Sequence, residues 1–375
     1  MFSSIRIERY RGFASLEMSG LGRVNLLVGS NNSGKTSLLE AIYLLNSMGD
    51  PLSLWQLLSR RGEWLPAAIS PGSAGSDRLQ GRMPLEVDVS RLFRGHDLQA
   101  GCSFSISTAN DTERRLECSV EEVSRREQPE LFASDEESGL ASRLVLRSSG
   151  KPRLDSAVVL TGAGGLSREV LGGSALRAIR QRQAEGSPAQ FITTESFSAS
   201  ELGAMWNNIA LTPTEALVLS ALQFLDPNIE RIAVLGTGSY QTPNRGGFII
   251  KLKGRERPIP IGSMGDGMWR MLAMAMAITQ CKGGVLLVDE IDTGLHYSVM
   301  AKMWGLIFNT AKALDVQVFA TTHSHDCVYS LAQLCSEVQP GESVTVQRIE
   351  SGSGRAVPYD PLELAAAASR GIEIR

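Results

Sequence analysis

The sequence predicts an α/β fold with a mixed sheet, an antiparallel β subdomain and an inserted helical subdomain. Three observations predict it: a glycine-rich loop between an apolar strand and a helix at residues 24–45, strand-like alternation over residues 85–160, and a strand, helix, strand succession over residues 285–321. A strand that returns to a parallel neighbour through a helix forms a right-handed crossover, which implies a parallel sheet. The 375 residues suffice for two or three domains with a sizeable hydrophobic core.

The composition is that of an ordinary globular chain, with 43% hydrophobic residues, 21% charged residues and a net charge of -3. Nucleic-acid binding is possible but finds no support in this charge, since it would need a local patch or a partner subunit. The first residues lack the features of a signal peptide, and no apolar run reaches the length of about 20 residues that spans a bilayer. We expect a cytoplasmic protein that does not enter a membrane.

Five cysteines occur in the sequence, and none has the spacing of a zinc or redox motif. Several lie in apolar runs, which is typical of thiols packed in a core. We interpret all five as core thiols of a reducing compartment: Cys102, Cys118, Cys281, Cys327 and Cys335.

The first half of the chain is expected to start with strands at residues 5–10 and 24–28 and a helix at residues 35–45. Residues 50–80 contain several prolines and a Gly/Ser stretch, which indicates an irregular or partly helical segment. Alternation then predicts antiparallel strands over residues 85–106, 116–123 and 143–160. A long exposed loop is expected at residues 124–139.

The second half begins with two helices, at residues 197–208 and 213–225, which we expect to form an inserted arm or cap. Thr212 is the predicted N-cap of the second helix, with Pro213 at its first position. The later elements are expected as strands at residues 229–235, 246–253, 258–261, 285–289 and 316–321 and helices at residues 267–280 and 298–314. We predict an N-terminal lobe at residues 1–50, the β subdomain with its insertion at residues 51–240, and a C-terminal lobe at residues 241–375.

The loop after the first apolar strand has the sequence of a phosphate-binding P-loop in the strand-to-helix context that this motif requires. Its backbone N–H groups and the helix N-terminus would cradle phosphates, Lys35 would reach the β- and γ-phosphates, and Thr36 would bind Mg²⁺. The residues predicted to contact the nucleotide here are Gly29, Ser30, Asn31, Asn32, Ser33, Gly34, Lys35, Thr36 and Ser37.

Two later strands end in polar residues that belong beside this loop. The strand at residues 285–289 ends in Asp289 and Glu290, which places Asp289 for a role in Mg²⁺ binding and Glu290 for orienting and polarising the attacking water. The strand at residues 316–321 delivers His323 to the same edge, where an imidazole can contact the γ-phosphate. His96 and His325 are expected to be ordinary surface histidines.

A second anion site is predicted at residues 263–267, which precede a helix that is apolar nearly all round. Ser263, Gly265, Asp266 and Gly267 could present donors to a γ-phosphate. Because the first loop already cradles the phosphates, this second site most economically serves a nucleotide held by another protomer.

With these four elements in this order, the chain resembles the ABC-type ATPases of the structural-maintenance-of-chromosomes (SMC), RecF and overcoming-lysogenization-defect kind, and in particular stand-alone prokaryotic AAA family ATPases without a Toprim domain. The residues that carry the resemblance are the opening residues 5–13, the P-loop, the signature-like residues 263–270, the block at residues 289–296, Thr322-His323-Ser324 and the closing residues 371–375.

This resemblance implies the P-loop NTPase head of an ABC ATPase, which dimerises head-to-head around two ATP molecules with Mg²⁺. Lys35, Glu290 and His323 would act on the reaction, Thr36 and Asp289 would hold the metal, and Ser263 would come from the other subunit. Asp292 would face the partner subunit. For His296, a role in the site and a role at the dimer interface are alternatives. The glutamine of the family's Q-loop cannot be placed, with Gln80, Gln99 and Gln128 as candidates.

The short C-terminal remainder of the chain narrows the function. About 50 residues come after His323, so we expect any nuclease to be a separate protein. The leading hypothesis is an ATP-dependent, dimerising switch or scaffold for a partner effector, most plausibly in prokaryotic antiviral defence. The alternatives are a RecF-like DNA-repair ATPase that binds duplex DNA directly, and an ATP-binding scaffold that opens and closes without turnover.

Overall fold

The computed structural model describes residues 1–65, 86–108, 114–124, 140–149, 154–168, 170–172, 187–193, 197–234, 247–337 and 344–370. The chain divides into two compact units. Unit 1 comprises residues 1–3, 18–39 and 187–375, and unit 2 comprises residues 4–17 and 40–186. The described part of the chain contains no helix with the length and apolar character that crossing a membrane requires.

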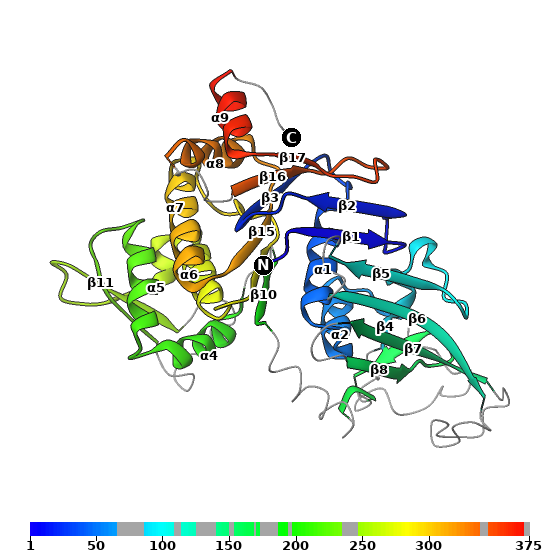
Figure 1. The fold of residues 1–375 in the computed structure, drawn as a ribbon. Helices are drawn as coiled ribbons and strands as arrows, with labels where there is room; N and C mark the ends of the chain where they lie inside the picture. The colour runs from blue at the N-terminus through cyan, green and yellow to red at the C-terminus, as the bar shows by residue number, and fades with distance from the viewer. Residues whose placement is uncertain are drawn as a thin grey trace. The chain divides into compact units, whose positions relative to one another are not determined.

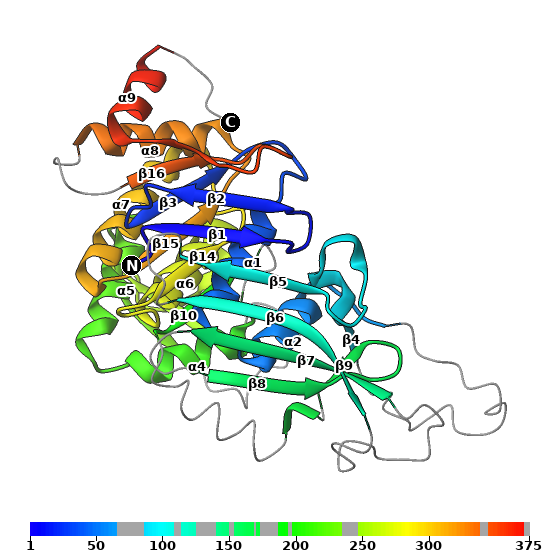
Figure 2. The same ribbon diagram turned by 45° about the vertical axis from the view of Figure 1, so that its right-hand side comes forward.

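Unit 2 is built on an antiparallel sheet, whose strands appear one after another in Figure 2. Their order is β2 (Ser15–Ser19), β1 (Ser4–Glu8), β5 (Ser103–Ser107), β6 (Arg115–Ser124), β7 (Leu140–Ser149) and β8 (Leu154–Val159). A short two-stranded sheet pairs β4 (Glu86–Asp88) with β9 (Gly165–Ser167). The predicted antiparallel subdomain is thus confirmed, whereas the predicted loop at residues 124–139 falls, except for its first residue, outside the described residues.

One predicted strand of unit 2, over residues 85–106, is wrong in its middle. Only β4 and β5 are extended, and short 3₁₀ helices at Val89–Leu92 and Arg94–His96 lie between them. The Asp88 side chain accepts a hydrogen bond from Ser90 N at 3.1 Å, and Gly95 adopts a φ of +83°. These two turn-forming residues end the strand locally, because a carboxylate cap and a left-handed glycine both favour a bend.

Helix α2 (Pro51–Arg60) fills part of the segment predicted to be irregular or partly helical. Asp50 caps it by accepting from Leu52 N at 3.1 Å, and Pro51 occupies the first turn. A proline at this position needs no N–H partner, so it starts the helix instead of interrupting it.

Unit 1 is built on a mixed sheet flanked by helices (Figure 1). Its strand order is β10 (Ala189–Ile192), β14 (Val285–Val288), β15 (Gln317–Thr321), β3 (Val24–Val28), β16 (Val344–Arg348) and β17 (Val357–Tyr359). The pairs from β10 to β16 are parallel, and β17 is antiparallel to β16. This arrangement brings the carboxyl ends of β14, β15, β3 and β16 to one edge of the sheet.

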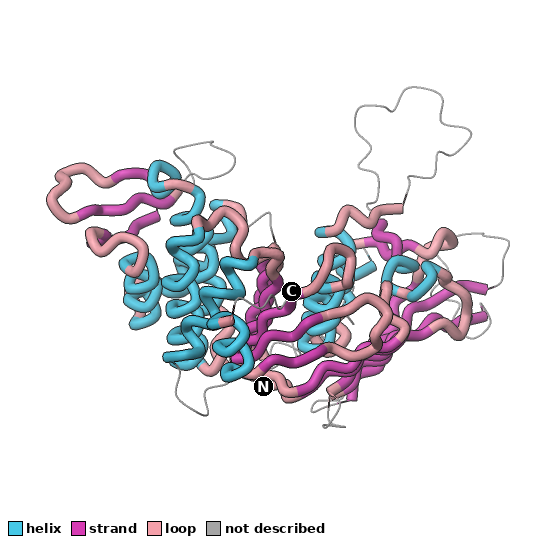
Figure 3. The backbone as a smooth tube through the Cα atoms, turned by 90° about the horizontal axis from the view of Figure 1, so that it is seen from above, coloured by secondary structure: helices cyan, strands magenta, loops and turns pink. Residues whose placement is uncertain are grey.

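The helices of unit 1 gather along the strands of its sheet, as Figure 3 shows. They are α4 (Ala199–Ile209), α5 (Pro213–Gln223), α6 (Asp266–Thr279), α7 (Tyr297–Leu314), α8 (His325–Glu337) and α9 (Pro361–Ser369). The inserted helices α4 and α5 are followed by a small antiparallel sheet of β11 (Ile229–Val234), β12 (Phe248–Leu252) and β13 (Ile259–Pro260). The predicted mixed sheet and inserted helical subdomain are confirmed, and Thr212 caps α5 as expected.

The core of unit 1 lies between the sheet and these helices. Every residue of α6 from Met268 to Ile278 is buried, in agreement with its apolar pattern. Four cysteines are buried, and the fifth, Cys102, is half-buried. Burial raises the pKa of the Cys335 thiol to about 11, so this sulfur stays protonated and packs as an apolar group.

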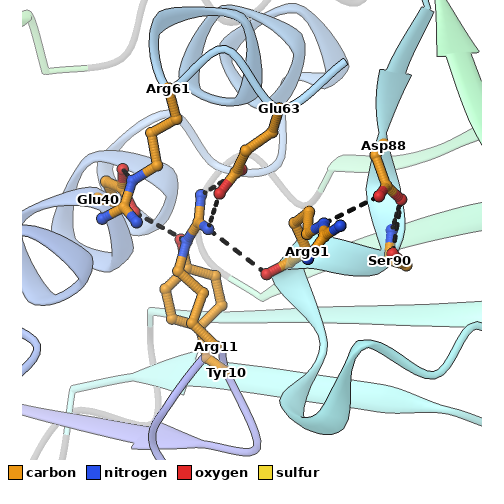
Figure 4. A network of polar contacts seen from close by, with 8 residues as sticks. All are labelled: Tyr10, Arg11, Glu40, Arg61, Glu63, Asp88, Ser90 and Arg91. Carbon is orange, nitrogen blue, oxygen red and sulfur yellow. Dashed lines mark hydrogen bonds and ion pairs between the residues drawn. The ribbon is translucent and has the colours of Figure 1, made fainter. Parts of the chain in front are cut away.

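Unit 2 contains a buried network of charged side chains (Figure 4). Arg11 lies with its Nε 2.8 Å from a Glu40 carboxylate oxygen, and its two terminal nitrogens donate to Glu63 at 2.7 and 3.0 Å. Arg61 pairs with the second oxygen of Glu40 at 2.5 Å. Burial raises the pKa of Glu40 to about 7, although both arginines act to lower it. The network therefore satisfies each buried charge with an opposite one.

Candidate nucleotide-binding site

The predicted P-loop joins β3 to helix α1 (Lys35–Asn46), and its backbone conformation depends on glycine. Gly29 has a φ of +145°, and a Cβ there would lie 2.3 Å from the carbonyl oxygen of Ile349. Gly34 has a φ of +95°. Any other residue at position 29 would collide with the β16 segment, so the loop needs a glycine where the motif has one.

Lys35 lies within the loop, and its Nζ donates to the carbonyl oxygens of Gly29 at 2.8 Å and Ser30 at 2.9 Å. The residue is 5% exposed. Burial lowers the pKa of Lys35, and the carboxylates of Asp289 and Glu290 act in the opposite direction. An ammonium group held this way is already inside the loop that would surround a phosphate.

The strand ends bring Asp289 to the start of α1. Thr36 Oγ1 donates to the two carboxylate oxygens of Asp289 at 3.0 and 3.2 Å, although the residues are 253 positions apart in the sequence. Thr321 Oγ1, at the end of β15, donates to Asp289 Oδ1 at 2.6 Å. Sequence reasoning did not identify Thr321, whose contact depends on the pairing of β14 with β15.

Glu290 follows Asp289 in a left-handed conformation, with a φ of +47°. Such a conformation is costly for a residue other than glycine, and it is found at functional sites where neighbouring contacts enforce it. Glu290 N donates to Thr321 Oγ1 at 2.8 Å, and Thr293 Oγ1 donates to the Glu290 carboxylate at 3.2 Å. Both contacts fix the turn that presents the Glu290 side chain.

Arg270 of α6 holds the backbone of this turn. Its guanidinium donates to the carbonyl oxygens of Thr193 at 2.8 Å, Asp289 at 3.1 Å and Glu290 at 3.2 Å. Arg270 is buried, and this burial lowers its pKa. In the sequence, Arg270 belongs to the signature-like segment but was assigned no role. The signal available there was a single arginine in an otherwise apolar helix.

Within the described ranges, no arginine or lysine forms a salt bridge with Asp289 or Glu290, and Arg270 donates to carbonyl oxygens. The two carboxylates still act to raise the pKa of Lys35 and of Arg270. A hydroxyl and a carboxylate are hard oxygen donors of the kind that Mg²⁺ takes alongside substrate phosphates. Thr36 and Asp289 thus fit the predicted metal, while no cluster of three or more His, Cys, Asp or Glu side chains suited to a metal occurs among the described residues.

His323 lies at the end of β15 and lines a pocket of about 530 Å³. The other lining residues come from the start of the P-loop and from the segment after β16: Gly29, Ser30, Asn31, Arg348, Ile349, Glu350 and Ser351. Strand β16 was not among the strands predicted from the sequence, so Arg348 and Glu350 were missed. Its short run of valines and threonine was the available signal.

The predicted second anion site lies at the N-terminus of α6. Ser263 belongs to a short 3₁₀ helix (Ile261–Met264), and Gly265 precedes α6 with a φ of +93°. Ser263, Gly265 and Asp266 are exposed. None of them is a lining residue of the pocket that contains His323.

The remaining candidates have ordinary surroundings. Asp292 accepts a hydrogen bond from Thr322 Oγ1 at 2.5 Å, and His296 caps α7 through Ser298. His96 and His325 are exposed, as predicted. Of the three candidate Q-loop glutamines, Gln99 is exposed in unit 2, whereas Gln80 and Gln128 fall outside the described residues.

Comparison with known proteins gives two family matches. Residues 163–326 match the family described as "AAA domain, putative AbiEii toxin, Type IV TA system", and residues 1–57 match the family described as "AAA ATPase domain". An ATP/GTP phosphatase of Helicobacter pylori is 22% identical over 360 residues, which cover 90% of this chain and 89% of that protein.

Two further similarities concern RecF and SMC proteins. The DNA replication and repair protein RecF of Bacillus thuringiensis is 46% identical over 43 residues, or 12% of each chain. The crystal structure of an SMC head bound to the C-terminal winged-helix domain of ScpA aligns with a TM-score of 0.46 and 13% identity, covering 96% of this chain and 98% of that one. Taken together, the family and sequence matches and the P-loop geometry make this chain similar to AAA-type P-loop ATPases, and they support ATP hydrolysis.

Proposed function

We propose that the chain binds ATP with Mg²⁺ at the carboxyl edge of the unit 1 sheet, closes head-to-head with a second copy, and acts as a switch for a separate effector protein in prokaryotic antiviral defence. The observation that carries the ATP site is the convergence of Thr36, Asp289 and Thr321 beside the P-loop. The family description that mentions the AbiEii toxin and a toxin–antitoxin system supports the defence role.

In the proposed reaction, the P-loop amides of residues 29–36 and the Lys35 ammonium bind the β- and γ-phosphates, with Ser37 in the first turn of α1. Thr36 and Asp289 would hold Mg²⁺, which would supply positive charge that neutralises the phosphate oxygens. Glu290 orients a water molecule and accepts its proton as the water oxygen bonds to the γ-phosphorus. The bond between this phosphorus and the β–γ bridging oxygen breaks, and its electron pair leaves with ADP. His323 contacts the γ-phosphate.

The exposed N-terminus of α6 supports the composite dimer. Asp266 and Gly267 lie in the first turn of a 14-residue helix, and Ser263 and Gly265 come just before it. The N-terminus of such a helix attracts an anion. These residues do not line the pocket beside the P-loop of their own protomer. We assign this helix N-terminus to the nucleotide of a second protomer, because the P-loop already surrounds the phosphates of its own. Tyr297, which follows His296, is 63% exposed and offers apolar surface for the same interface.

The inserted helices supply the proposed surface for the effector. Leu211 lies between α4 and α5, is 98% exposed and has a φ of +63°. Phe224, at the end of α5, is 49% exposed. We assign this surface to the effector because both exposed apolar side chains lie at the ends of the inserted helices.

The sharpest test is Glu290→Gln. This variant should still bind ATP, lose hydrolysis and elute as a dimer from a gel-filtration column run with ATP and Mg²⁺. Ser263→Arg in the same background should restore the monomer with little change in nucleotide affinity, while Ser336→Arg, which adds the same charge at an exposed serine of α8, should leave the dimer intact. An unchanged hydrolysis rate in Glu290→Gln would remove this residue from the mechanism, and a dimer that survives Ser263→Arg would exclude the composite site.

The RecF-like alternative rests on the match of 43 residues to RecF proteins. It predicts hydrolysis that duplex DNA stimulates and that added salt suppresses steeply, because phosphate contacts release counterions. The switch predicts hydrolysis that DNA leaves unchanged and that a co-encoded protein alters. Titrating the wild-type ATPase with duplex DNA at two salt concentrations, and then with the product of the adjacent gene, separates the two.

A further inference from the structure

The pocket that contains His323 is lined by a segment that the proposed reaction does not use. Its lining residues are residues 29–31 of the P-loop, His323, and the segment from Arg348, the last residue of β16, to Ser351. The later loop residues from Ser33 to Thr36 are not lining residues. The pocket adjoins the proposed nucleotide site at the start of the P-loop and at His323, the residue proposed to contact the γ-phosphate.

The segment from Arg348 to Ser351 is fixed to the P-loop by backbone contacts. Strand β16 runs parallel to β3 with Arg348 opposite Val28, and Ile349 N donates to Val28 O at 2.8 Å. The Ile349 carbonyl oxygen is in close contact with Gly29, where a Cβ would lie only 2.3 Å away. Because Ile349 is locked against the start of the loop, its neighbours Arg348 and Glu350 are held at the pocket.

Arg348 is the one lining residue among those described that carries a permanent positive charge. Its guanidinium lies 3.1 Å from Glu350, with the two side chains 37% and 47% exposed. An ion pair this exposed contributes little stability, whereas a guanidinium binds a phosphate with two parallel hydrogen bonds. A phosphate in the pocket can therefore replace Glu350 as the partner of the Arg348 guanidinium.

We propose that Arg348 leaves Glu350 when ATP binds and contacts the terminal phosphate, so that it makes the site favour the triphosphate over the diphosphate. This inference rests on the proposed nucleotide site. Arg348 and His323, which line the same pocket, both contact the γ-phosphate. Glu350 holds the guanidinium in place while the nucleotide is absent.

The test is the affinity of the full chain for a non-hydrolysable ATP analogue and for ADP, each with Mg²⁺, measured by isothermal titration calorimetry. Arg348→Ala should weaken binding of the analogue about tenfold and change ADP binding less than twofold. The affinity of Arg348→Lys for the analogue should lie between those of the wild type and Arg348→Ala, since an ammonium keeps the charge but loses the paired hydrogen bonds. Glu350→Gln, which removes the competing carboxylate, should bind the analogue at least as tightly as the wild type.

Arg355→Ala is the matched control, because Arg355 is an exposed arginine in the turn after β16 that does not line the pocket. It should bind both nucleotides like the wild type. Equal losses for the analogue and ADP in Arg348→Ala, or no loss for either, would overturn the inference. If the wild type binds neither nucleotide, the proposed site itself fails. A thermal unfolding curve for each variant ensures that only folded protein is compared, and Arg348→Gln replaces the alanine variant if that one does not fold.

Discussion

Two regions of this molecule gather charged side chains, and they treat those charges in opposite ways. In unit 2, Arg11, Glu40, Arg61 and Glu63 neutralise one another in the interior. At the strand ends of unit 1, Asp289 and Glu290 are held by threonine hydroxyls and backbone groups, without a salt bridge to an arginine or lysine of the described chain. The charges of the first set are paired with one another, whereas the carboxylate oxygens of the second set stay out of direct ion pairs and can bind a metal.

Neutral groups supply the direct hydrogen bonds of the strand-end carboxylates. A half-buried carboxylate gains from hydrogen bonds, and hydroxyl donors provide them without an ion pair. Arg270 could have formed an ion pair here, yet it donates to three carbonyl oxygens. The difference between the two regions should therefore appear as a difference between stability and activity.

The largest expected effect breaks the unit 2 network. Arg11→Met leaves Glu63 unpaired and Glu40 with Arg61 alone, and removing one partner of a buried ion pair costs about 3–5 kcal/mol in the free energy of unfolding. Denaturant titration measures this loss, and adding Glu40→Gln should recover part of it.

Lys35→Met is the counterpart in the nucleotide site. It should reduce ATP hydrolysis at least about a hundredfold while changing the unfolding free energy by less than about 1 kcal/mol, because the ammonium of Lys35 donates to two carbonyl oxygens of its own loop. A loss of stability as large as that of Arg11→Met would mean that the two regions do not differ as described.

The next effect concerns the pH dependence of stability. Burial raises the pKa of Glu40 from its ordinary 4.5 to about 7, so the folded chain retains a proton that the unfolded chain releases. The contribution of Glu40 to the unfolding free energy is therefore full below pH 4.5 and falls as the pH rises to about 7, with a slope of up to about 1.4 kcal/mol per pH unit.

Denaturant titrations at several pH values between about 5 and 8 check this slope, and Glu40→Gln should flatten it. Parallel curves for the two proteins would show that Arg11 and Arg61 keep the Glu40 carboxylate ionised throughout. That result would make the unit 2 network a fully charged one.

The smallest effect sharpens the comparison at the strand ends. Thr321→Val keeps the shape of a side chain that is 1% exposed but removes its hydrogen bonds to Asp289 and to Glu290 N. We expect hydrolysis to slow by roughly three- to tenfold and stability to fall by about 1 kcal/mol. Steady-state kinetics and thermal unfolding measure the two changes.

Thr345→Val is the control for this variant, because Thr345 is also buried in a strand and its hydroxyl donates to Asn25 at 3.0 Å. It should lose a similar amount of stability with an unchanged hydrolysis rate. A slower rate in both variants would assign the effect to the sheet and not to the hydroxyl of Thr321.

Much of the candidate site could be predicted because its signals are local. The P-loop needs glycines where the backbone turns left-handed or meets another segment, and apolar strands followed by polar residues indicate the edge of a parallel sheet. Asp289 was predicted from such a run and lies beside Thr36, as its strand end requires. The placement of the residues at 263–267 relative to a nucleotide stays a prediction, because it depends on a second copy.

The sequence by itself determined the fold class, the loop, the strand ends and the buried helix α6, since each is encoded by residues close together in the chain. Only the tertiary structure decided the contacts of Thr321 and Arg270, the place of Arg348 in the pocket and the pairing of Arg11 with Glu40. The physical reason is that these contacts depend on strand order and on side chains that meet across long sequence separations, as when β16 pairs with β3. A hydroxyl or guanidinium carries no local sign of which distant oxygen it will meet.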